Sequence, residues 1–114
     1  KKRLEREEEE NSNGETAMLY FIERMENEGL YLLDEPENSL SLENQMKLAD
    51  YIFSSARFFN YQFVIATHSA IFLSIPHAKI YNLDDNSMVV DSWTQLKSVR
   101  LMFDLFMKHK EEFD

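Results

Sequence analysis

Two short polar segments, each directly after an apolar run, carry the residue types that phosphate-hydrolysing enzymes use. Asp34 and Glu35 follow the apolar run 30–33, and Thr-His-Ser at 67–69 follows a second apolar run. A carboxylate in the position of Asp34 can orient a hydrated Mg²⁺, which prefers one or two carboxylates together with waters and substrate phosphates. Glu35 can polarise a water for in-line attack on a terminal phosphate, and His68 can hydrogen-bond that water or the transferred phosphoryl group.

The elements that must position these residues follow from the periodicity of the apolar side chains. Helical spacing predicts helices over residues 16–27, 42–58 and about 95–109, and a short helical segment at 70–73. Short apolar runs predict strands at 30–33, 62–66 and 79–83, and residues 88–90 pair back as a hairpin across the turn sequence 84–87. Methionine and phenylalanine side chains at helical spacing are expected in the core.

The helix over residues 42–58 has a recognisable apolar stripe. The stripe is formed by Leu42, Met46, Ala49, Phe53 and Ala56, and it is flanked by Leu48, Ile52 and Phe59. Side chains three and four positions apart share one side of a helix, so an amphipathic helix that runs to about residue 58 is expected.

The order of these elements is that of an α/β sandwich. Right-handed crossovers would put the strands at 30–33 and 62–66 in one parallel sheet, with each strand buried on both faces. Ligands of such sheets collect beyond the carboxyl ends of the strands. We therefore expect Asp34, Glu35 and His68 to converge on one rim.

Composition limits what this rim can belong to. The 114 residues include 44% hydrophobic and 13% aromatic side chains, enough for one small packed domain. The net charge of −9 argues against a grip on a nucleic-acid backbone, although an acidic chain can still bind a nucleotide through metal ions and helix ends. The absence of cysteine excludes disulfides, thiolate catalysis and zinc-thiolate sites.

The ends of the chain and its apolar runs bear on its setting. No apolar run approaches the ~20 residues of a membrane span and no signal-peptide pattern is present, so a soluble, cytoplasmic protein without a membrane partner is expected. The chain starts with Lys rather than Met, and residues 1–10 are almost wholly charged. We expect a solvated helix end or tail there, and a chain that begins partway through a longer protein.

A family resemblance gives these residues more specific roles. The segment Leu-Tyr-Leu-Leu-Asp-Glu-Pro-Glu-Asn-Ser-Leu-Ser at 30–41 resembles the Walker B motif and D-loop of ATP-binding-cassette (ABC) ATPases, and Val-Ile-Ala-Thr-His-Ser at 64–69 resembles their switch-histidine strand. The resemblance implies that Asp34 belongs to the magnesium shell, that Glu35 is the catalytic glutamate and that His68 senses the γ-phosphate of ATP.

The D-loop part of the resemblance departs from the family at one position. It is carried by Asn38, Ser39, Leu40 and Ser41, and it implies nucleotide contacts from Ser39 and Ser41. The aspartate that usually closes this loop is replaced by Ser41, which puts any step that needs that aspartate in doubt.

An upstream segment has two interpretations. Ser12, Asn13, Gly14 and Glu15 resemble a loose form of the ABC signature motif at the start of a helix, where a hydroxyl, a flexible backbone and a helix N-terminus suit phosphate oxygens. In the family this motif faces the nucleotide of the opposite subunit, which implies a head-to-tail dimer with ATP between protomers. The alternative is a local capping box in which Ser12 and Glu15 satisfy backbone amides.

The phosphate-binding loop of the family is missing from this sequence. Nothing resembles Gly-x-x-x-x-Gly-Lys-Ser/Thr, and the two glycines, Gly14 and Gly29, cannot form such a loop. The Q-loop is not identifiable either. The chain alone is therefore expected neither to bind ATP tightly nor to hydrolyse it, and an N-terminal Walker A half is the implied partner.

The resemblance covers residues 11–84 and implies a domain organisation. Residues 11–114, after the charged segment 1–10, would be the C-terminal half of an ABC-type nucleotide-binding domain. Its expected fold is α/β, a partial three-layer sandwich of the P-loop NTPase type with a mainly parallel sheet and a C-terminal hairpin.

Three functions remain open at this point. The first is ATP hydrolysis, with Mg²⁺, in a soluble ABC-type machine of DNA repair, chromosome maintenance or defence; DNA is then a candidate partner of the intact protein, though not through this acidic chain. The second is a metal-dependent nuclease or phosphohydrolase that uses Asp34, Glu35 and Glu37, against which Pro36 and the lack of a further acidic motif weigh. The third is a non-catalytic remnant that serves as an interaction module.

Overall fold

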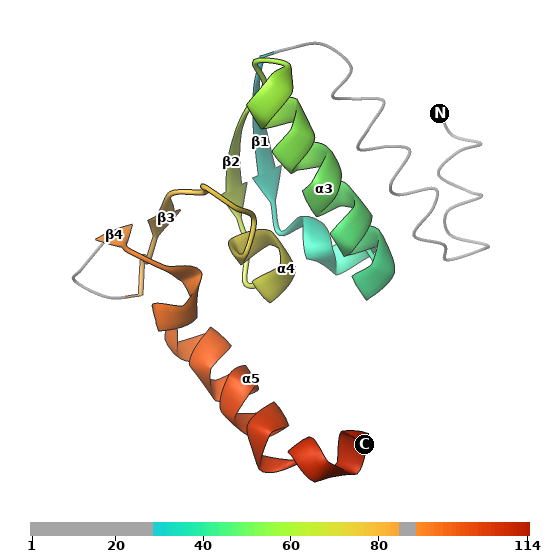
Figure 1. Cartoon of the computed structure of the whole chain (residues 1–114). Coiled ribbons are helices and arrows are strands. Elements are labelled where there is room, and N and C mark those ends of the chain that lie inside the picture. The colour runs from blue at the N-terminus through green and yellow to red at the C-terminus, as the bar shows by residue number, and fades with distance from the viewer. Residues whose placement is uncertain (1–28, 85–88) are drawn as a thin grey trace. The chain divides into compact units, whose positions relative to one another are not determined.

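The computed structural model describes residues 29–84 and 89–114, and the chain divides into two compact units, 1–75 and 76–114. The described part of the first unit contains β1 (Leu30–Asp34), the 3-10 helix η1 (Pro36–Ser39), α3 (Leu42–Phe58), β2 (Gln62–Ala66) and α4 (Ala70–Leu73) (Figure 1). The second unit contains β3 (Ile80–Tyr81), β4 (Val89–Val90), η2 (Trp93–Gln95), α5 (Lys97–Lys108) and η3 (Lys110–Phe113). The helix expected over 16–27 lies outside the described residues.

The first unit is built on a parallel strand pair. β1 pairs with β2 from Leu30 opposite Gln62 to Asp34 opposite Ala66, and α3 is the crossover helix that connects the two strands (Figure 1). Parallel strands cannot be joined by a tight turn, so a helical crossover of this length is the usual solution. The predicted parallel pair, the bounds of the helix over 42–58 and the short helix at 70–73 are confirmed.

Local sequence sets both ends of α3. Ser41 is its N-cap, and its Oγ accepts a hydrogen bond from the backbone N–H of Asn44 at 3.2 Å. After the last turn, Asn60 adopts the left-handed conformation with φ 63°, and the N–H of Tyr61 donates to the carbonyl of Ser55 at 3.2 Å. Asn tolerates this conformation better than most residues. The Ser55 carbonyl also accepts from the Phe59 N–H at 3.1 Å, so this one carbonyl holds the chain on both sides of Asn60. The chain can therefore turn directly into β2.

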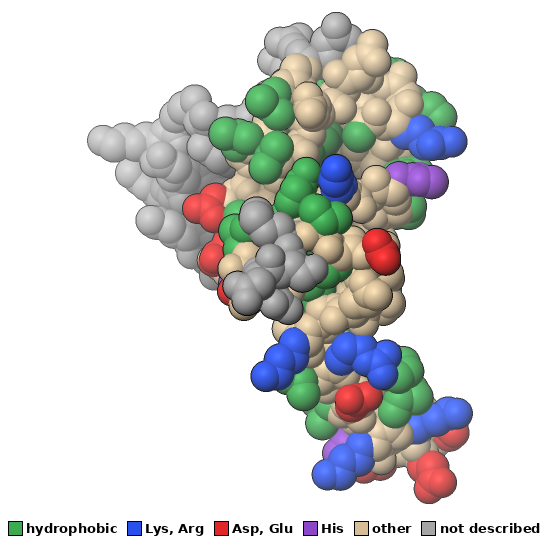
Figure 2. Space-filling model, turned by 90° about the vertical axis from the view of Figure 1, so that its left-hand side faces the viewer, with side chains coloured by type: hydrophobic (Ala, Val, Ile, Leu, Met, Phe, Trp, Pro, Cys, Tyr) green, Lys and Arg blue, Asp and Glu red, His purple; other side chains and the backbone are tan. Residues whose placement is uncertain are grey.

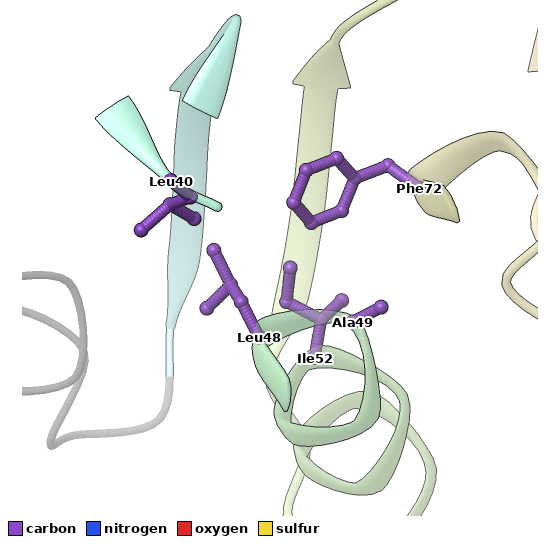
Figure 3. Packing of buried hydrophobic residues seen from close by; sticks show 5 residues of the cluster. All are labelled: Leu40, Leu48, Ala49, Ile52 and Phe72. Carbon is purple, nitrogen blue, oxygen red and sulfur yellow. The ribbon is translucent and has the colours of Figure 1, made fainter. Parts of the chain in front are cut away.

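The core of the first unit lies between α3 and the strand pair. Figure 3 shows side chains of the cluster converging from α3, from the loop after η1 and from α4; its members are Leu40, Leu48, Ala49, Ile52 and Phe72. Leu48 is the centre of this cluster, with 0% of its surface exposed. Tyr31, Leu33, Phe63 and Ile65 of the strands pack against the cluster and complete it.

The inward face of α3 differs from the predicted stripe. Leu42 is 68% exposed and Met46 is also exposed, whereas the flanking residues Leu48 and Ile52 are buried. The reason is that polar side chains occupy inward positions of the helix, namely Asn44, Gln45 and Ser55. Counting apolar residues alone therefore placed the centre of the stripe too far round the helix.

One face of the strand pair is covered and the other is not. Tyr31, Leu33 and their neighbours on β2 face α3, whereas on the opposite face Leu32 is 73% exposed and Leu30 and Val64 are also exposed. The prediction that each strand is buried on both faces is therefore wrong for residues 29–75. The helices α3 and α4 and the strand pair form two layers within residues 29–75, and the expected three-layer sandwich is not seen in these residues.

The second unit begins with a short hairpin. β3 and β4 pair antiparallel, with Ile80 opposite Val90 and Tyr81 opposite Val89. The predicted hairpin is confirmed, although its first strand is shorter than the predicted 79–83. Ser92 then starts η2 with a capping box, in which the Gln95 side chain accepts from the Ser92 N–H at 3.3 Å.

The final helix, α5, is amphipathic but has no buried residue. Its large apolar side chains are each about half exposed: Leu101, Met102, Phe103, Leu105, Phe106 and Met107. Figure 2 shows hydrophobic side chains beside basic and acidic ones over this helix. The prediction that methionines and phenylalanines at helical spacing are core residues is therefore wrong for α5.

Candidate active site

The predicted site residues leave the sheet at one edge. Asp34 is the last residue of β1 and lies opposite Ala66, the last residue of β2, so both strands end at the same level. The pairing continues one step further, because the N–H of Glu35 donates to the carbonyl of Ala66 at 2.7 Å. The segment 67–69, called the histidine loop below, starts at this point. The turn that carries Glu35 and the loop that carries His68 are therefore adjacent.

Glu35 has an unusual backbone conformation. Its φ of 47° and ψ of 57° lie in the left-handed region, which costs an L-residue with a β-carbon roughly 1–2 kcal/mol. Pro36 does not account for this conformation, because a residue before proline is driven toward extended backbone instead. The Asn38 Nδ2 donates to Glu35 Oε1 at 2.9 Å, and the Asn38 N–H donates to the Glu35 carbonyl at 3.1 Å. Strained residues held in this way concentrate at functional sites.

Glu37 joins the turn after β1 to the histidine loop. The Thr67 hydroxyl donates to Glu37 Oε1 at 2.6 Å, and the backbone N–H of His68 donates to Glu37 Oε2 at 2.9 Å. Partial burial acts to raise the pKa of Glu37, but the hydrogen bonds from Thr67 and His68 prevail and hold this pKa below its ordinary value of 4.5. Glu37 is therefore a carboxylate with both oxygens engaged.

A second set of bonds holds the far end of the histidine loop. The Ser69 N–H donates to Thr67 Oγ1 at 2.9 Å, and the Ser69 hydroxyl donates to Gln45 Oε1 of α3 at 2.7 Å. Gln45 is itself buried, and its Nε2 donates to the Leu40 carbonyl at 3.2 Å. The loop is thus fixed by η1 on one side and by α3 on the other, while the side chain of His68 is exposed.

The other predicted site residues either make hydrogen bonds to residues near them in the sequence or lie outside the described residues. The Ser41 hydroxyl caps α3, and the Ser39 hydroxyl donates to the Pro36 carbonyl at 3.5 Å. Both serines are exposed, so the assignment of nucleotide contacts to them stays a prediction. The segment 12–15 lies outside the described residues, and the choice between a signature motif and a capping box there is untested.

The carboxylates bear on which metal chemistry the site can support. Within residues 29–84 and 89–114, no group of three or more His, Asp or Glu side chains could together hold a metal ion. The cluster of Asp34, Glu35 and Glu37 that a nuclease would need is not assembled, because Glu37 is turned to the histidine loop. Asp34 alone, exposed at a strand end, suits Mg²⁺ that takes its remaining ligands from water and substrate phosphates.

Three contributors to this geometry were not identified from the sequence. The sequence pattern suggests Glu37 only as a metal ligand, and it indicates no hydrogen bond from Asn38 or Gln45 to the site residues. Glu37 and Asn38 bond across turns that no periodicity describes. A signal existed for Gln45, because a polar residue beside Leu48 and Ala49 on the inward side of a helix needs a buried partner.

Comparison with known proteins bears on the fold. No protein-family model and no curated protein matches the chain. A solved structure from work on the ATP-driven dimerisation and DNA-stimulated activation of SMC ATPases is similar, with a TM-score of 0.52 and 21% sequence identity over 84% of this chain. The likeness is one of fold. It supports a mixed α/β fold like that of the SMC ATPase structure.

The match is partial in length. It covers 60% of the SMC ATPase chain, so the rest of that protein has no counterpart in the compared region. In the part of the chain that the structure describes, no helix is both long enough and apolar enough to cross a bilayer.

Proposed function

We propose that this chain is the carboxyl-side half of an ABC-type ATPase domain and contributes the hydrolytic groups to its ATP site. The observation that carries the proposal is that an Asp-Glu pair and a histidine leave two adjacent parallel strands at one carboxyl edge. The strained turn at Glu35 and the fold similarity to an SMC ATPase support it.

In this proposal the side chains at the edge act on the terminal phosphate of ATP. Glu35 polarises the attacking water through Oε2, because its Oε1 is held by Asn38. His68 donates a hydrogen bond to the γ-phosphate from its exposed imidazole, whose loop is fixed at both ends. Asp34 holds Mg²⁺, which neutralises charge on the phosphates when it is bound. Ser39 and Ser41 would contribute nucleotide contacts from the segment between η1 and α3.

Two further components are proposed to complete the site. A Walker A half would grip the phosphates, since the two glycines of this chain cannot form that loop. A second protomer would present its own segment 12–15 to the nucleotide in a head-to-tail dimer. The SMC ATPase work concerns DNA-stimulated activation, but the net charge of −9 leads us to assign no DNA contact to this chain.

The proposed division of the ATPase domain into two halves can be tested with the 114-residue chain alone. Titration of the chain with Mg-ATP in a calorimeter is expected to give no strong heat, because the phosphate grip lies elsewhere. Binding with a Kd of about 1 μM, roughly 8 kcal/mol of binding free energy, would contradict the division.

The hydrolytic role is tested in a polypeptide that joins this chain to a preceding Walker A segment. Glu35→Gln keeps the size of the side chain but removes the base, and turnover is expected to fall by at least about 10²-fold. ATP binding and ATP-dependent dimerisation should persist in this variant, because neither needs the water to be polarised. Glu43→Gln is the matched control, since Glu43 is an exposed carboxylate in the first turn of α3 and undergoes the same change of carboxylate to carboxamide.

The same variant separates the competing functions. If the turnover rate of Glu35→Gln stays within about threefold of the wild-type rate, Glu35 is not the base, because a general base contributes ~10²-fold or more. Nuclease activity that Glu35→Gln abolishes without any dependence on ATP would favour the metal-dependent nuclease. Wild-type protein that binds ATP but never hydrolyses it would favour the non-catalytic module.

A further inference from the structure

We infer that Glu37 is a positioning residue, which holds the main chain of His68 at a fixed place relative to Glu35. The inference rests on the proposed function, in which Glu35 and His68 act on the same phosphate. Glu37 follows Glu35 within one turn, and its carboxylate reaches a loop that lies some thirty residues further along the chain. A single side chain thereby links the two proposed hydrolytic segments.

The link is rigid at its η1 end. The Asn38 N–H donates to the Glu35 carbonyl at 3.1 Å, and the Leu40 N–H donates to the Glu37 carbonyl at 3.2 Å. These bonds close successive turns of η1 over the backbone of Glu35 and Glu37. A displacement of Glu37 would therefore displace the strained turn that carries the proposed base.

The link is also rigid at its histidine end. Oε2 of Glu37 binds the backbone N–H of His68 itself at 2.9 Å, rather than the imidazole, so the imidazole stays available to a substrate. Oε1 binds the Thr67 hydroxyl at 2.6 Å, and that hydroxyl in turn accepts from the Ser69 N–H at 2.9 Å. The carboxylate thus fixes all three residues of the histidine loop.

An ionised carboxylate suits this arrangement. Both groups that face Glu37 donate to it, and an ionised carboxylate offers an acceptor to each of them. Glutamine has one acceptor oxygen and one amino group that only donates, so in Glu37→Gln both contacts persist only if the Thr67 hydroxyl turns and accepts instead of donating. Bonds to an ionised acceptor are about twice as strong as neutral ones, so the bond to the His68 N–H weakens in either case.

The weakening of this bond is measured first in the 114-residue chain, without ATP. In Glu37→Gln, exchange of the His68 amide hydrogen, followed by NMR, is expected to be about 10-fold faster than in the wild type, because the bond to an uncharged acceptor is weaker. The amide of Leu48 serves as the internal control, because it lies in the core of α3 and reports global stability. Glu111→Gln, an exposed carboxylate of η3, is the matched control variant and should leave the His68 rate unchanged.

The positioning role is then measured in the ATPase that contains a Walker A segment. Because a misplacement of about 1 Å can cost 10²-fold in rate, Glu37→Gln is expected to lower kcat by about 10- to 100-fold. The Kd for ATP should change by less than about twofold, since the phosphate grip lies elsewhere. Thr67→Ser, which keeps the hydroxyl, should retain kcat, and Thr67→Val should lower it.

The outcomes identify which inference fails. A His68 exchange rate that Glu37→Gln leaves at the wild-type value overturns the link, whether or not ATP turnover is found. Accelerated exchange with an unchanged kcat overturns the positioning role. If Glu37→Gln does not fold, Thr67→Val replaces it, and a kcat equal to that of Thr67→Ser overturns the role in the same way. A wild-type ATPase assembly without turnover overturns the proposed function and leaves the link to be judged by exchange alone.

Discussion

Substitution of Glu35 by glycine and by alanine measures the strain in its turn apart from its chemistry. Both variants remove the carboxylate and its bond from Asn38, so they differ only in the β-carbon and in backbone freedom. The left-handed φ of 47° costs a residue with a β-carbon about 1–2 kcal/mol, and glycine avoids this cost. Glycine also lowers the free energy of unfolding by about 0.4–1 kcal/mol relative to alanine, because it gives the unfolded chain more conformational entropy. We expect Glu35→Gly to be more stable than Glu35→Ala by about 0.5–1 kcal/mol.

Ser54 provides the control for this comparison. It is exposed in the interior of α3, where the backbone is ordinary right-handed helix. At such a position alanine is more stable than glycine by about 1 kcal/mol. The order of the two substitutions should therefore be opposite at Glu35 and at Ser54, which removes any general effect of glycine on the chain.

The measurement is urea unfolding of the 114-residue chain, followed by circular dichroism at a wavelength that reports the helices. Midpoints are compared at a common slope, so that a difference in midpoint is a difference in the free energy of unfolding. The strain would be refuted if Glu35→Ala were as stable as Glu35→Gly, or more stable, while alanine remained more stable than glycine at Ser54. The proposed base would then stand in a turn that the sequence adopts without cost.

Three further outcomes are expected. Leu48 lies at the centre of the core with 0% exposure, so Leu48→Ala should lower the free energy of unfolding, measured in urea, by about 2–5 kcal/mol. Leu42 is 68% exposed, so Leu42→Ala should change it by no more than about 0.5 kcal/mol. Equal losses in the two variants would refute the inward face assigned to α3. Glu37 binds protons less readily in the folded chain than in the unfolded one, so its stabilisation is complete above its ordinary pKa of 4.5 and is lost as the pH falls through the lower folded pKa. Acid titration of stability should therefore be flatter in Glu37→Gln, and an unaltered profile would refute the bonded carboxylate. Ser41→Ala should cost about 1 kcal/mol by removing the cap of α3 and Ser41→Asp should cost little, as thermal unfolding can measure; equal stability of both would refute the cap.

The first unit could be predicted from the sequence where local and tertiary preferences agree. β1, α3, β2 and α4 were placed to within a residue or so, because their apolar runs and helical spacing match what packing requires. The prediction failed where the pattern depended on an unseen environment. The strands are apolar on both faces, yet in the described residues only the face toward α3 is covered, and Leu30, Leu32 and Val64 on the other face are exposed. The apolar character of a side chain indicates that burial is favourable, but it does not indicate which element covers that side chain.

The site divides in the same way. That Asp34, Glu35 and His68 share one edge of the sheet was predictable, because each lies at or just after the end of a strand and parallel pairing brings strand ends together. Glu37, Asn38 and Gln45 were not, because their bonds depend on the left-handed turn at Glu35 and on which side of α3 faces inward. Neither feature has a period in the sequence. The residues that hold a site in place are therefore harder to predict from sequence than the residues proposed to act in it.

The turn at Glu35 joins these observations into one physical argument. A strained, non-glycine residue persists only where its surroundings over-determine it, and here the surroundings are bonds from Glu35 to Ala66 and from Asn38 to Glu35. Glu37, in the same turn, extends the constraint to the histidine loop through two further bonds. All of these hydrogen-bond partners lie within residues 34–68, so the contacts that tie the proposed base to the histidine loop lie close to the edge of the strand pair. In the proposed function, a separate phosphate-binding segment would therefore meet a base and a histidine that are already linked to each other.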